Sequence, residues 1–522
     1  MSKLLTMDQA LDLIKDGDNV ACSGFMLMTT PRGIYKAIGE RFLETGHPCN
    51  LTVMHAAGNG NNNDQGIIEM SHEGLITRYI CGHFANNKRL IEQTNANKIK
   101  CYNFPQGVVA HMFRAAAAGK IGEITKIGLG TFCDPRFGGG KMNEATTEDL
   151  VELIDILGQE HLLYKVPTLN IGLIRGTTAD EYGNITLEEE AAPVDALDVA
   201  MAVKSMGGKV IVQVKQVVSS KSVERNKVII PGTMVDAVVI AENPEETHRQ
   251  TPGSYYDPVL AGYYKVEAQS AKKMLLDERK VIARRAAMEL RKNSVVNLGI
   301  GIPEGVATVA NEEGCGQELI LTVESGLIGG IPTGGYNFGS AMNAWAALPM
   351  TSQFDFYNGG NLALTCLGFA EVDENGNVNV SRFGTKIAGA GGFIDISQST
   401  KTVVFCGTMT AGGLKLAVED GKMVIVEEGK KVKFKKAIDQ FTFSADFSKK
   451  FGQKVLFVTE RCVFQVKEEG LVLTEVAPGI DIEKDILPYM EFAPIVPEHV
   501  ELMDARLFAE EPMGLGEILS NK

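Results

Sequence analysis

Short apolar runs that end in glycine alternate with helical stretches along this chain. The first run is NVACSG at 19–24, and it follows a stretch in which Thr6 and Gln9 have the spacing of a helix capping box. A run of β-branched residues followed by a glycine turn and a helix is typical of an α/β unit around a buried sheet. The pattern therefore predicts an α/β fold with a mainly parallel sheet.

The two halves of the chain repeat these signals in the same order. DNVACSGF at 18–25 aligns with NSVVNLGI at 293–300, and ADEYGNIT at 179–186 aligns with VDENGNVN at 372–379. The first pair is a strand ending in glycine, and the second is an acidic hairpin with an Asn or Tyr before its glycine. The segment between the two signals is longer in the first half. The repeat indicates two related domains, the first with an insertion; ordinary convergence between α/β units is the alternative.

The length of the chain agrees with two domains. Its 522 residues exceed the roughly 250 to 300 that one hydrophobic core supports. We expect an amino-terminal α/β domain at 1–245 and a carboxy-terminal α/β domain at 275–522. A connector rich in Pro, Gly, Tyr and charged residues joins them at 246–274.

Charge and cysteine usage exclude several classes of function. The net charge of -14 disfavours a phosphate-backbone surface, so nucleic-acid binding is not expected. The nine cysteines form no Cys-x-x-Cys pair, and no histidines stand at metal-ligand spacing, so no metal site is predicted. No stretch approaches the 18 or so apolar residues of a membrane helix. We expect a cytoplasmic protein with reduced thiols and no membrane partner.

One carboxylate follows a strand signature directly. ELILTV at 318–323 is typical of a buried strand, which puts Glu324 at the carboxyl end, where open α/β sheets bind their ligands. Ser325, Gly326 and a run of later glycines leave room for another molecule to approach. A purely structural carboxylate that faces a helix amino end is the alternative.

Three further segments are candidates for binding. VVNLGIGIPEGV at 295–306 is a strand followed by Gly299, Gly301 and Pro303, a turn and helix start that could hold phosphates. Gly299, Gly301 and Gly305 together resemble a dinucleotide loop, and Glu324 lies as far beyond Gly305 as a ribose-binding acid does in that fold. An NAD(P)-dependent dehydrogenase is therefore one alternative function.

The other two segments offer polar groups for an anion. KIAGAGGFIDIS at 386–397 places Gly389, Gly391 and Gly392 in a segment whose backbone amides suit an anion or a developing oxyanion. NFPQG at 103–107 presents Gln106 in a Pro-Gln-Gly turn ahead of a helix. A turn amide of this kind is usually solvated or capping.

Taken together, LTVESGLIGG, NLGIGIPEGVA, FPQG, AGAGGF and FVTERCVFQVKEEGLVLTEVAPGID resemble family I coenzyme A transferases of the single-chain acetate and propionate type. The resemblance covers essentially the whole chain. It implies two fused α/β halves, with Glu324 as the nucleophile, Gln106 as an oxyanion donor and main-chain donors at 389–392. GFMLMTTP at 24–31 and GSAMNAWAALPM at 339–350 depart from the family pattern, and these departures concern acyl specificity.

The resemblance also implies a reaction. It is the reversible transfer of coenzyme A between short-chain acyl-CoA thioesters and free acids such as acetate and propionate, by a ping-pong mechanism through a glutamyl anhydride and a glutamyl-CoA thioester. Coenzyme A is then a substrate, no cofactor is bound permanently, and the protein is a homo-oligomer, a dimer or tetramer. A CoA-binding module without catalysis is the second alternative. The scattered histidines, among them His83, His111 and His248, are interpreted as structural or solvated.

Overall fold

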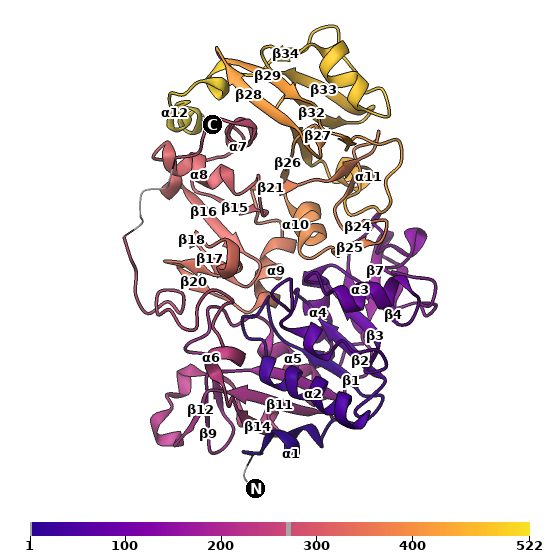
Figure 1. Cartoon of the computed structure of the whole chain (residues 1–522), viewed down its shortest axis with the longest axis vertical. Helices are drawn as coiled ribbons and strands as arrows, with labels where there is room; N and C mark the ends of the chain where they lie inside the picture. The colour runs from indigo at the N-terminus through magenta and orange to yellow at the C-terminus, as the bar shows by residue number, and fades with distance from the viewer. Residues whose placement is uncertain (1–2, 268–272, 522) are drawn as a thin grey trace. The chain divides into compact units, whose positions relative to one another are not determined.

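The computed structural model describes residues 3–267 and 273–521, which form two compact units. The first unit contains the chain up to Val266 together with Val323–Phe356 and Arg382–Asp395. The second contains Glu267–Thr322, Tyr357–Ser381 and the chain from Ile396 onward. Glu324 therefore belongs to the first unit, whereas the predicted division of the chain at 246–274 placed it in the carboxy-terminal domain. Figure 1 labels the helices and strands described below.

The first unit is built on a seven-stranded sheet in which all neighbours are parallel, as predicted. Its strand order is β14-β11-β8-β1-β2-β3-β4. The strands are β1 (Asn19–Cys22), β2 (Leu51–His55), β3 (Ile76–Cys81), β4 (Lys100–Asn103), β8 (Ile171–Arg175), β11 (Lys209–Val214) and β14 (Ala237–Ile240). Their residues are largely buried, which is typical of a parallel sheet covered on both faces.

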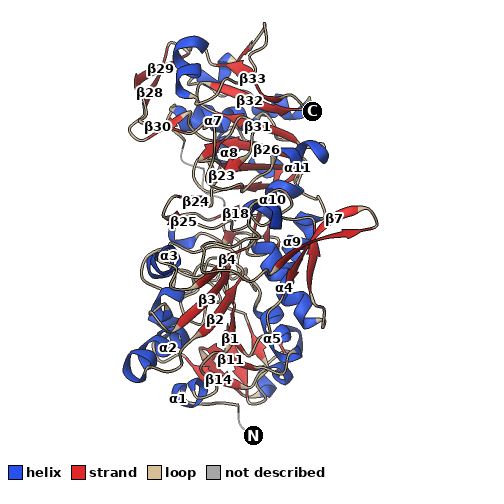
Figure 2. Ribbon diagram, turned by 90° about the vertical axis from the view of Figure 1, so that its right-hand side faces the viewer, coloured by secondary structure: helices blue, strands red, loops and turns tan. Residues whose placement is uncertain are grey.

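Helices cover both faces of this sheet. Figure 2 shows α2 (Arg32–Thr45) and α3 (Lys88–Asn95) on one side of the strands, and α4 (Gln106–Ala117) and α5 (Ala196–Ser205) on the other. A second sheet, antiparallel apart from its β12–β9 pair, has the order β12-β9-β10-β13, and a three-stranded antiparallel sheet has the order β5-β7-β6. These strands are β5 (Gly122–Thr125), β6 (Val151–Ile156), β7 (Gln159–Lys165), β9 (Thr178–Asp180), β10 (Ile185–Thr186), β12 (Gln216–Val218) and β13 (Val228–Ile230).

Short elements complete the first unit. The helices are α1 (Met7–Leu11), α6 (Pro244–Thr247), α9 (Met350–Asn358) and α10 (Phe393–Ser399), of which the last two extend past the boundary of the unit. Three antiparallel pairs are β17 (Leu327–Ile328) with β20 (Ala346–Ala347), β18 (Ile331–Pro332) with β19 (Ala341–Met342), and β24 (Arg382–Phe383) with β25 (Lys386–Ile387).

The second unit contains strands in the order β16-β15-β21-β26-β31-β32-β33-β34, and the first five of these are mutually parallel. They are β15 (Ser294–Leu298), β16 (Leu319–Val323), β21 (Leu364–Gly368), β26 (Thr402–Cys406), β31 (Lys454–Val458), β32 (Cys462–Lys467), β33 (Gly470–Val476) and β34 (Glu501–Leu502). Helices α7 (Glu278–Ala287) and α8 (Gly305–Glu312) contribute Val281, Ile282, Val306 and Val309 to its apolar core.

Smaller elements surround this sheet. They are α11 (Ala445–Lys450), α12 (Leu515–Ser520), and the antiparallel pairs β22 (Glu371–Val372) with β23 (Val378–Asn379), β27 (Thr410–Ala411) with β30 (Lys431–Val432), and β28 (Lys415–Glu419) with β29 (Lys422–Glu427).

The two sheets share one topology. Strands β14-β11-β8-β1-β2 of the first unit correspond in chain order and neighbours to β31-β26-β21-β15-β16 of the second. The aligned sequence signals at 18–25 and 293–300 fall on the corresponding strands β1 and β15. Between β2 and β8 the first unit carries β3 to β7 with α3 and α4, which is the predicted insertion and the part that contains Gln106.

The paired hairpins also agree in detail. Asp180 Oδ1 accepts hydrogen bonds from the amides of Tyr182 and Asn184, both at 2.9 Å. Asp373 Oδ1 accepts in the same way from Asn375 at 3.0 Å and Asn377 at 2.8 Å. In each hairpin a glycine with positive φ closes the turn, at 80° for Gly183 and 89° for Gly376. The repeat seen in the sequence is therefore a repeat of structure.

The remaining local predictions concern the amino terminus, the cysteines and the helices. The Thr6 hydroxyl accepts from the Gln9 amide, and Gln9 Oε1 accepts from the Thr6 amide, so the capping box is confirmed at the start of α1. The cysteines are free, and eight of the nine are buried. Within 3–267 and 273–521, every helix is too short or too polar to cross a bilayer.

Candidate active site

Glu324 is the residue that directly follows β16, at the carboxyl end of the strand as predicted. It begins a tight turn in which the Gly326 amide donates to the Val323 carbonyl at 3.0 Å. Gly326 has a φ of 119°, and a side chain there would overlap the carbonyl oxygen of Leu348. The Ser325 hydroxyl donates to the Gly339 carbonyl at 2.6 Å. Both residues after the glutamate are therefore anchored, which orients its side chain.

The carboxyl group of Glu324 combines partial exposure with a desolvated environment. The residue is half-buried, and its carboxylate has no hydrogen bond or ion pair with any residue of the described chain. Burial without a compensating positive charge raises its pKa from 4.5 to about 7. A partly exposed carboxylate that has a raised pKa and no partner is a candidate functional group.

Gln106 is the first residue of α4 and is almost fully buried. Its backbone amide donates to the Gly391 carbonyl at 2.8 Å. Its side-chain Nε2 lies 3.4 Å from the Met350 sulfur. A thioether is a weak acceptor, so the carboxamide gives up little when it turns to a stronger one. The side chain is thus held in place but remains a usable donor.

The glycine segment at 389–392 lies against the same helix start. The Gly391 amide donates to the Gly82 carbonyl at 2.8 Å, and the Ala390 amide donates to Asn103 Oδ1 at 2.8 Å. The Gly392 amide has no partner in the described chain. The sequence predicted that the Gly391 and Gly392 amides would both face an anion. The Gly391 amide instead donates to the Gly82 carbonyl at the end of β3. Of these two amides, only that of Gly392 has no acceptor within the described residues.

A continuous set of contacts inside the first unit connects Glu324 to Gln106. The Gly326 carbonyl accepts from the Leu348 amide at 2.8 Å, and two residues later Met350 begins α9 and contacts the Gln106 side chain. Gln106 in turn bonds Gly391. The structure therefore brings together the glutamate turn, the glutamine and the glycine segment, which are far apart in the sequence.

The loop at 24–31 lies beside this group. The Phe25 and Phe338 rings contact in a tilted arrangement, with ring centroids 5.9 Å apart, and a side chain on Gly339 would overlap Phe25 and Met28. Since the Gly339 carbonyl holds Ser325, the loop packs next to the glutamate turn. The segment 24–31, which departs from the pattern of the resemblance, therefore lies next to the turn that carries Glu324.

Buried charges fix the shape of this loop. Arg175 Nη1 donates to the carbonyls of Leu27 at 3.1 Å and Thr30 at 3.2 Å, and its Nη2 pairs with Glu190 at 2.5 Å. Burial would raise the pKa of Glu190, but the Arg175 charge lowers it to about 2. Met26 and Thr29 have φ values of 55° and 50°, a conformation that costs energy for residues other than glycine. The Arg175–Glu190 pair holds the loop in this strained form.

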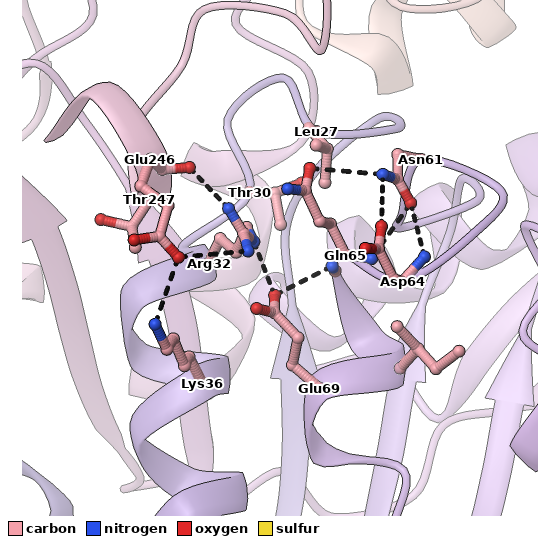
Figure 3. Close-up of polar contacts among 12 residues, drawn as sticks. Leu27, Thr30, Arg32, Lys36, Asn61, Asp64, Gln65, Glu69, Glu246 and Thr247 are labelled. Carbon is pink, nitrogen blue, oxygen red and sulfur yellow. Dashed lines mark hydrogen bonds and ion pairs between the residues drawn. The ribbon is translucent and has the colours of Figure 1, made fainter. Parts of the chain in front are cut away.

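A second polar network follows the loop in the chain. Arg32, at the start of α2, donates to Glu69 at 2.8 Å and to the Glu246 carbonyl at 2.6 Å, and Lys36 also reaches Glu246 (Figure 3). A pocket of about 290 Å³ lies alongside, lined by Lys36, Glu40, Leu43, Asn63, Asp64, Ile68, Glu69, His72 and Arg89. None of these is a predicted site residue, and the lining carries both signs of charge. The pocket is therefore separate from the group around Glu324.

Gly299, Gly301 and Pro303 lie in the second unit, between β15 and α8. The Gly299 amide donates to the Cys366 carbonyl at 2.8 Å, and Gly301 has a φ of 89° with open space around it. The strand, glycine turn and helix start occur as predicted. In a dinucleotide-binding fold, the ribose-binding acid follows the strand next to the one that ends in the glycine loop. Glu324 has the same position, because it follows β16, and β16 pairs with β15. Local topology alone thus leaves the dehydrogenase alternative open.

The three histidines named in the sequence analysis have different surroundings. His111 bonds the Thr351 carbonyl and Asp355, both at 3.0 Å, and His248 bonds Gln213 at 3.0 Å, so these two are structural as expected. His83 is different, because it lies against the glycine segment. The sequence carried no signal for this placement, which depends on a contact between residues some 300 positions apart in the chain.

One group of potential metal ligands was missed in the sequence. Asp16, His47 and Cys49 have their ligand atoms within 4.8 Å of one another. His47 Nδ1 lies 2.7 Å from Asp16 Oδ2, and the Cys49 amide donates to Asp16 Oδ1 at 2.8 Å. These hydrogen bonds account for the grouping without a metal.

The sequence matches a known family model in its amino-terminal part and known proteins over nearly its whole length. The model of the coenzyme A transferase family matches residues 4–241. Caffeate CoA-transferase of Acetobacterium woodii is 44% identical over 99% of this chain and 100% of that protein. Acetate CoA-transferase YdiF of Escherichia coli strain K12 is 43% identical over 98% of this chain and 96% of that protein.

Solved structures agree with these relatives. The acyl-CoA transferase YdiF apoenzyme of Escherichia coli O157:H7 superimposes with a TM-score of 0.92, at 42% identity, over 98% of this chain and 97% of that chain. A thioester complex of the same enzyme with CoA matches with a TM-score of 0.91 at 41% identity, again over 98% and 97%. These full-length matches are to CoA-transferases and give no support to the dehydrogenase alternative.

Proposed function

Because this chain belongs to the coenzyme A transferase family, we propose that Glu324 is the nucleophile with which it transfers CoA between acyl-CoA thioesters and free carboxylic acids. The chain is a CoA-transferase by its full-length similarity to such enzymes. The observation that carries the role of Glu324 is its unpaired, half-buried carboxylate at the carboxyl end of β16. A carboxylate suits this reaction, since its acyl derivative is an anhydride that keeps the energy of a thioester. A serine would form an ester, which is too stable to return to a thioester easily.

The proposed reaction has two matched halves. The Glu324 carboxylate adds to the thioester carbonyl, the C–S bond breaks, and CoA leaves as a thiolate, giving a mixed anhydride. The thiolate then adds to the glutamyl carbonyl, the C–O bond breaks, and the first acid leaves as its carboxylate. A second carboxylate attacks the glutamyl-CoA thioester and the steps run in reverse. No proton is gained or lost, so no general acid or base is required.

Each half passes through a tetrahedral oxyanion, which needs a donor. We assign this role to the Gln106 side chain and the Gly392 amide, and we assign Gly389 and Gly391 to shaping the turn. Support comes from the weak Gln106–Met350 contact and from the free amide of Gly392. The Gly299, Gly301 and Pro303 turn at the start of α8 is our proposed contact for the CoA phosphates. CoA is a substrate in this scheme, and no permanently bound cofactor is used.

The raised pKa of Glu324 predicts a pH dependence. Only the carboxylate is nucleophilic, and below its pKa of about 7 the protonated form predominates. We expect kcat/KM for an acyl-CoA to rise about tenfold per pH unit below 7 and to level off above it, because this quantity reports the free enzyme. Initial rates between pH 5 and pH 9, at constant ionic strength, measure the profile. A rate that is already constant at pH 5 contradicts a nucleophile with this pKa.

We further propose short aliphatic acids, acetate and propionate foremost, as the substrates. The similarity to an acetate CoA-transferase supports this, whereas the similarity to a caffeate CoA-transferase raises an aromatic acid as the second candidate. The apolar side chains of Phe25 and Met28 beside the glutamate turn favour a small aliphatic group. Cytoplasmic localisation and a dimeric or tetrameric assembly remain part of the proposal. Exposed apolar side chains in and beside the three-stranded sheet would supply a surface for self-association: Leu153 of β6, Ile121 just before β5, and Leu157 in the turn between β6 and β7.

Competition kinetics tests the substrate proposal and the activity together. With propionyl-CoA as donor, we expect acetyl-CoA to form from acetate, and kcat/KM to fall as the acceptor grows from C2 or C3 to C6. One methylene changes selectivity by about 1 to 3 kcal/mol, so the decline should be severalfold or more per carbon. Caffeate and succinate serve as aromatic and dicarboxylic comparators. A preference for either comparator over acetate and propionate overturns the short-chain assignment, and failure of every acid overturns the proposed function.

A further inference from the structure

His83 lies in the first unit, beside Gln106 and the glycine segment at 389–392. It follows β3, in the turn that leads to α3, and its side chain is half-buried. The residue before it, Gly82, is packed so closely that an added side-chain carbon would lie 3.0 Å from the Gln106 Cα. The Gly82 carbonyl accepts the Gly391 amide. His83 therefore directly follows a residue, Gly82, that packs against Gln106 and hydrogen-bonds Gly391.

The imidazole itself borders the glycine segment. A side-chain carbon on Gly391 would lie 3.6 Å from His83 Cδ2, and one on Gly389 would lie 3.1 Å from the His83 Cα. Cδ2 is the ring carbon bonded to Nε2, so the Nε2 edge of the ring faces the side on which Gly391 lies. The absence of a side chain at Gly391 leaves that edge uncovered, and the absence of one at Gly389 lets the segment lie against the His83 backbone.

The opposite edge of the ring is fixed by the protein. The Ala85 amide donates to His83 Nδ1 at 2.9 Å, and a side-chain carbon on Gly58 would lie 2.9 Å from the same nitrogen. Since Nδ1 accepts a hydrogen bond, the proton of the neutral ring is on Nε2. The Gly58 carbonyl also accepts the Met26 amide at 2.6 Å, which places this edge against the loop at 24–31.

The ring is neutral at the pH of the cell. Desolvation lowers the pKa of His83 to about 4, and it does the same for the neighbouring His55. His83 Nε2–H thus stays a donor without a formal charge. It has no hydrogen-bond partner in residues 3–267 and 273–521. A half-buried donor with a fixed tautomer and no partner is suited to a ligand.

We infer that His83 is a catalytic residue of the CoA-transferase reaction, whose Nε2–H donates a hydrogen bond to the substrate-derived acyl oxygen as that oxygen becomes an oxyanion. This inference rests on the proposed function of Glu324. A neutral donor strengthens its bond as negative charge develops, so it stabilises the transition state more than the bound substrate. An imidazolium would instead pair with the free acid or with the Glu324 carboxylate and hold the ground state.

The test compares two substitutions that differ in where they place an amide nitrogen. In H83Q the side-chain nitrogen reaches the position of Nε2, whereas in H83N it reaches only that of Nδ1. We expect H83N to lower kcat about 10²- to 10³-fold with little change in KM for acyl-CoA, as for loss of one oxyanion donor. H83Q should recover at least about tenfold of that loss. H161N, a histidine of β7, is the matched control and should behave as wild type.

The outcomes separate the possible roles of His83. Rescue by H83Q, with thermal unfolding of both variants close to that of wild type, supports the donor. Unchanged kcat in H83N overturns it. Equal losses in H83N and H83Q, accompanied by a matching fall in unfolding temperature, also overturn it in favour of a packing role. The proposed function is tested separately, by the wild-type protein. If that protein converts no acid at all, the proposed function is refuted whatever the His83 variants do.

Discussion

Incubation of the protein with an acyl-CoA and no acceptor acid is expected to leave CoA attached to Glu324. The adduct is a glutamyl thioester, so intact-protein mass spectrometry should detect the mass of CoA less one water. Digestion should place that mass on the peptide that contains residue 324. The reason is that the released thiolate attacks the glutamyl carbonyl of the anhydride, and without a second acid the thioester has no further partner.

Substitution of Glu324 is expected to have the largest effect of any change in the chain. E324Q should abolish the adduct and lower turnover at least about 10⁴-fold, because a carboxamide oxygen is a poor nucleophile. E324D should be impaired by about a hundredfold or more, since the shorter side chain withdraws the carboxylate by about 1 Å. E374Q, at the exposed tip of the hairpin between β22 and β23, is the matched control and should form the adduct normally.

Loss of folding is not expected to explain the E324Q result. The pKa of Glu324 is raised to about 7 in the folded chain, so the fold favours the neutral form. Between pH 4.5 and pH 7 the folded state binds the extra proton, and ionising this group therefore lowers stability as the pH rises through that window. At pH 8, E324Q should unfold at the same temperature as wild type or above it. An adduct that persists in E324Q or E324A would assign the nucleophile to another residue.

Borohydride provides an independent measurement of the same intermediate. It should reduce the glutamyl thioester and inactivate protein that has been treated with acyl-CoA, because an activated carbonyl is electrophilic. A free carboxylate is inert to borohydride, so protein without acyl-CoA should keep its activity. Equal inactivation of both samples would mean that the reagent acts elsewhere.

Gln106→Ala is expected to lower kcat about 10²- to 10³-fold while changing KM for acyl-CoA little. The side chain acts on charge that exists only in the transition state, so its removal raises the barrier and leaves substrate binding intact. The variant retains the backbone hydrogen bond from residue 106 to the Gly391 carbonyl, and the substitution removes a weak hydrogen bond to the Met350 sulfur. Structural damage should therefore be small.

The control for this experiment is Q159A, which removes an exposed glutamine of β7 in the same unit. Steady-state kinetics and thermal unfolding of both variants distinguish chemistry from stability. An unchanged kcat in Q106A would remove Gln106 from the reaction. A large rise in KM with normal kcat would instead make it a binding residue.

Local patterns in the sequence predicted local structure well. The Thr6 and Gln9 capping box, the aspartate-closed hairpins at Asp180 and Asp373, and the strand that ends before Glu324 all depend on groups within a few residues of one another. Such features follow from backbone geometry and short-range hydrogen bonds, which the sequence encodes directly. The parallel sheets follow from the same alternation of apolar runs and glycine turns.

The site could be predicted only in part from the residues. Glu324 was identified by its position after a strand, but Gln106 and the glycine segment had weak signals of their own and were assigned roles through a resemblance. The structure places all of these residues in the first unit, which their separate sequence patterns did not indicate. The division into units also differs from a simple cut of the chain, since 323–356 and 382–395 join the first unit.

Tertiary structure decided which of the candidate groups remain available for chemistry. The Gly391 amide is occupied by the Gly82 carbonyl, whereas the Gly392 amide is free within the described chain, and no local rule distinguishes two adjacent glycines. His83 resembles any scattered histidine until the segment at 388–392 packs against it. The reason is physical: local order is set by neighbours in the chain, but the desolvation of a carboxylate and the availability of a donor depend on atoms that only folding brings near.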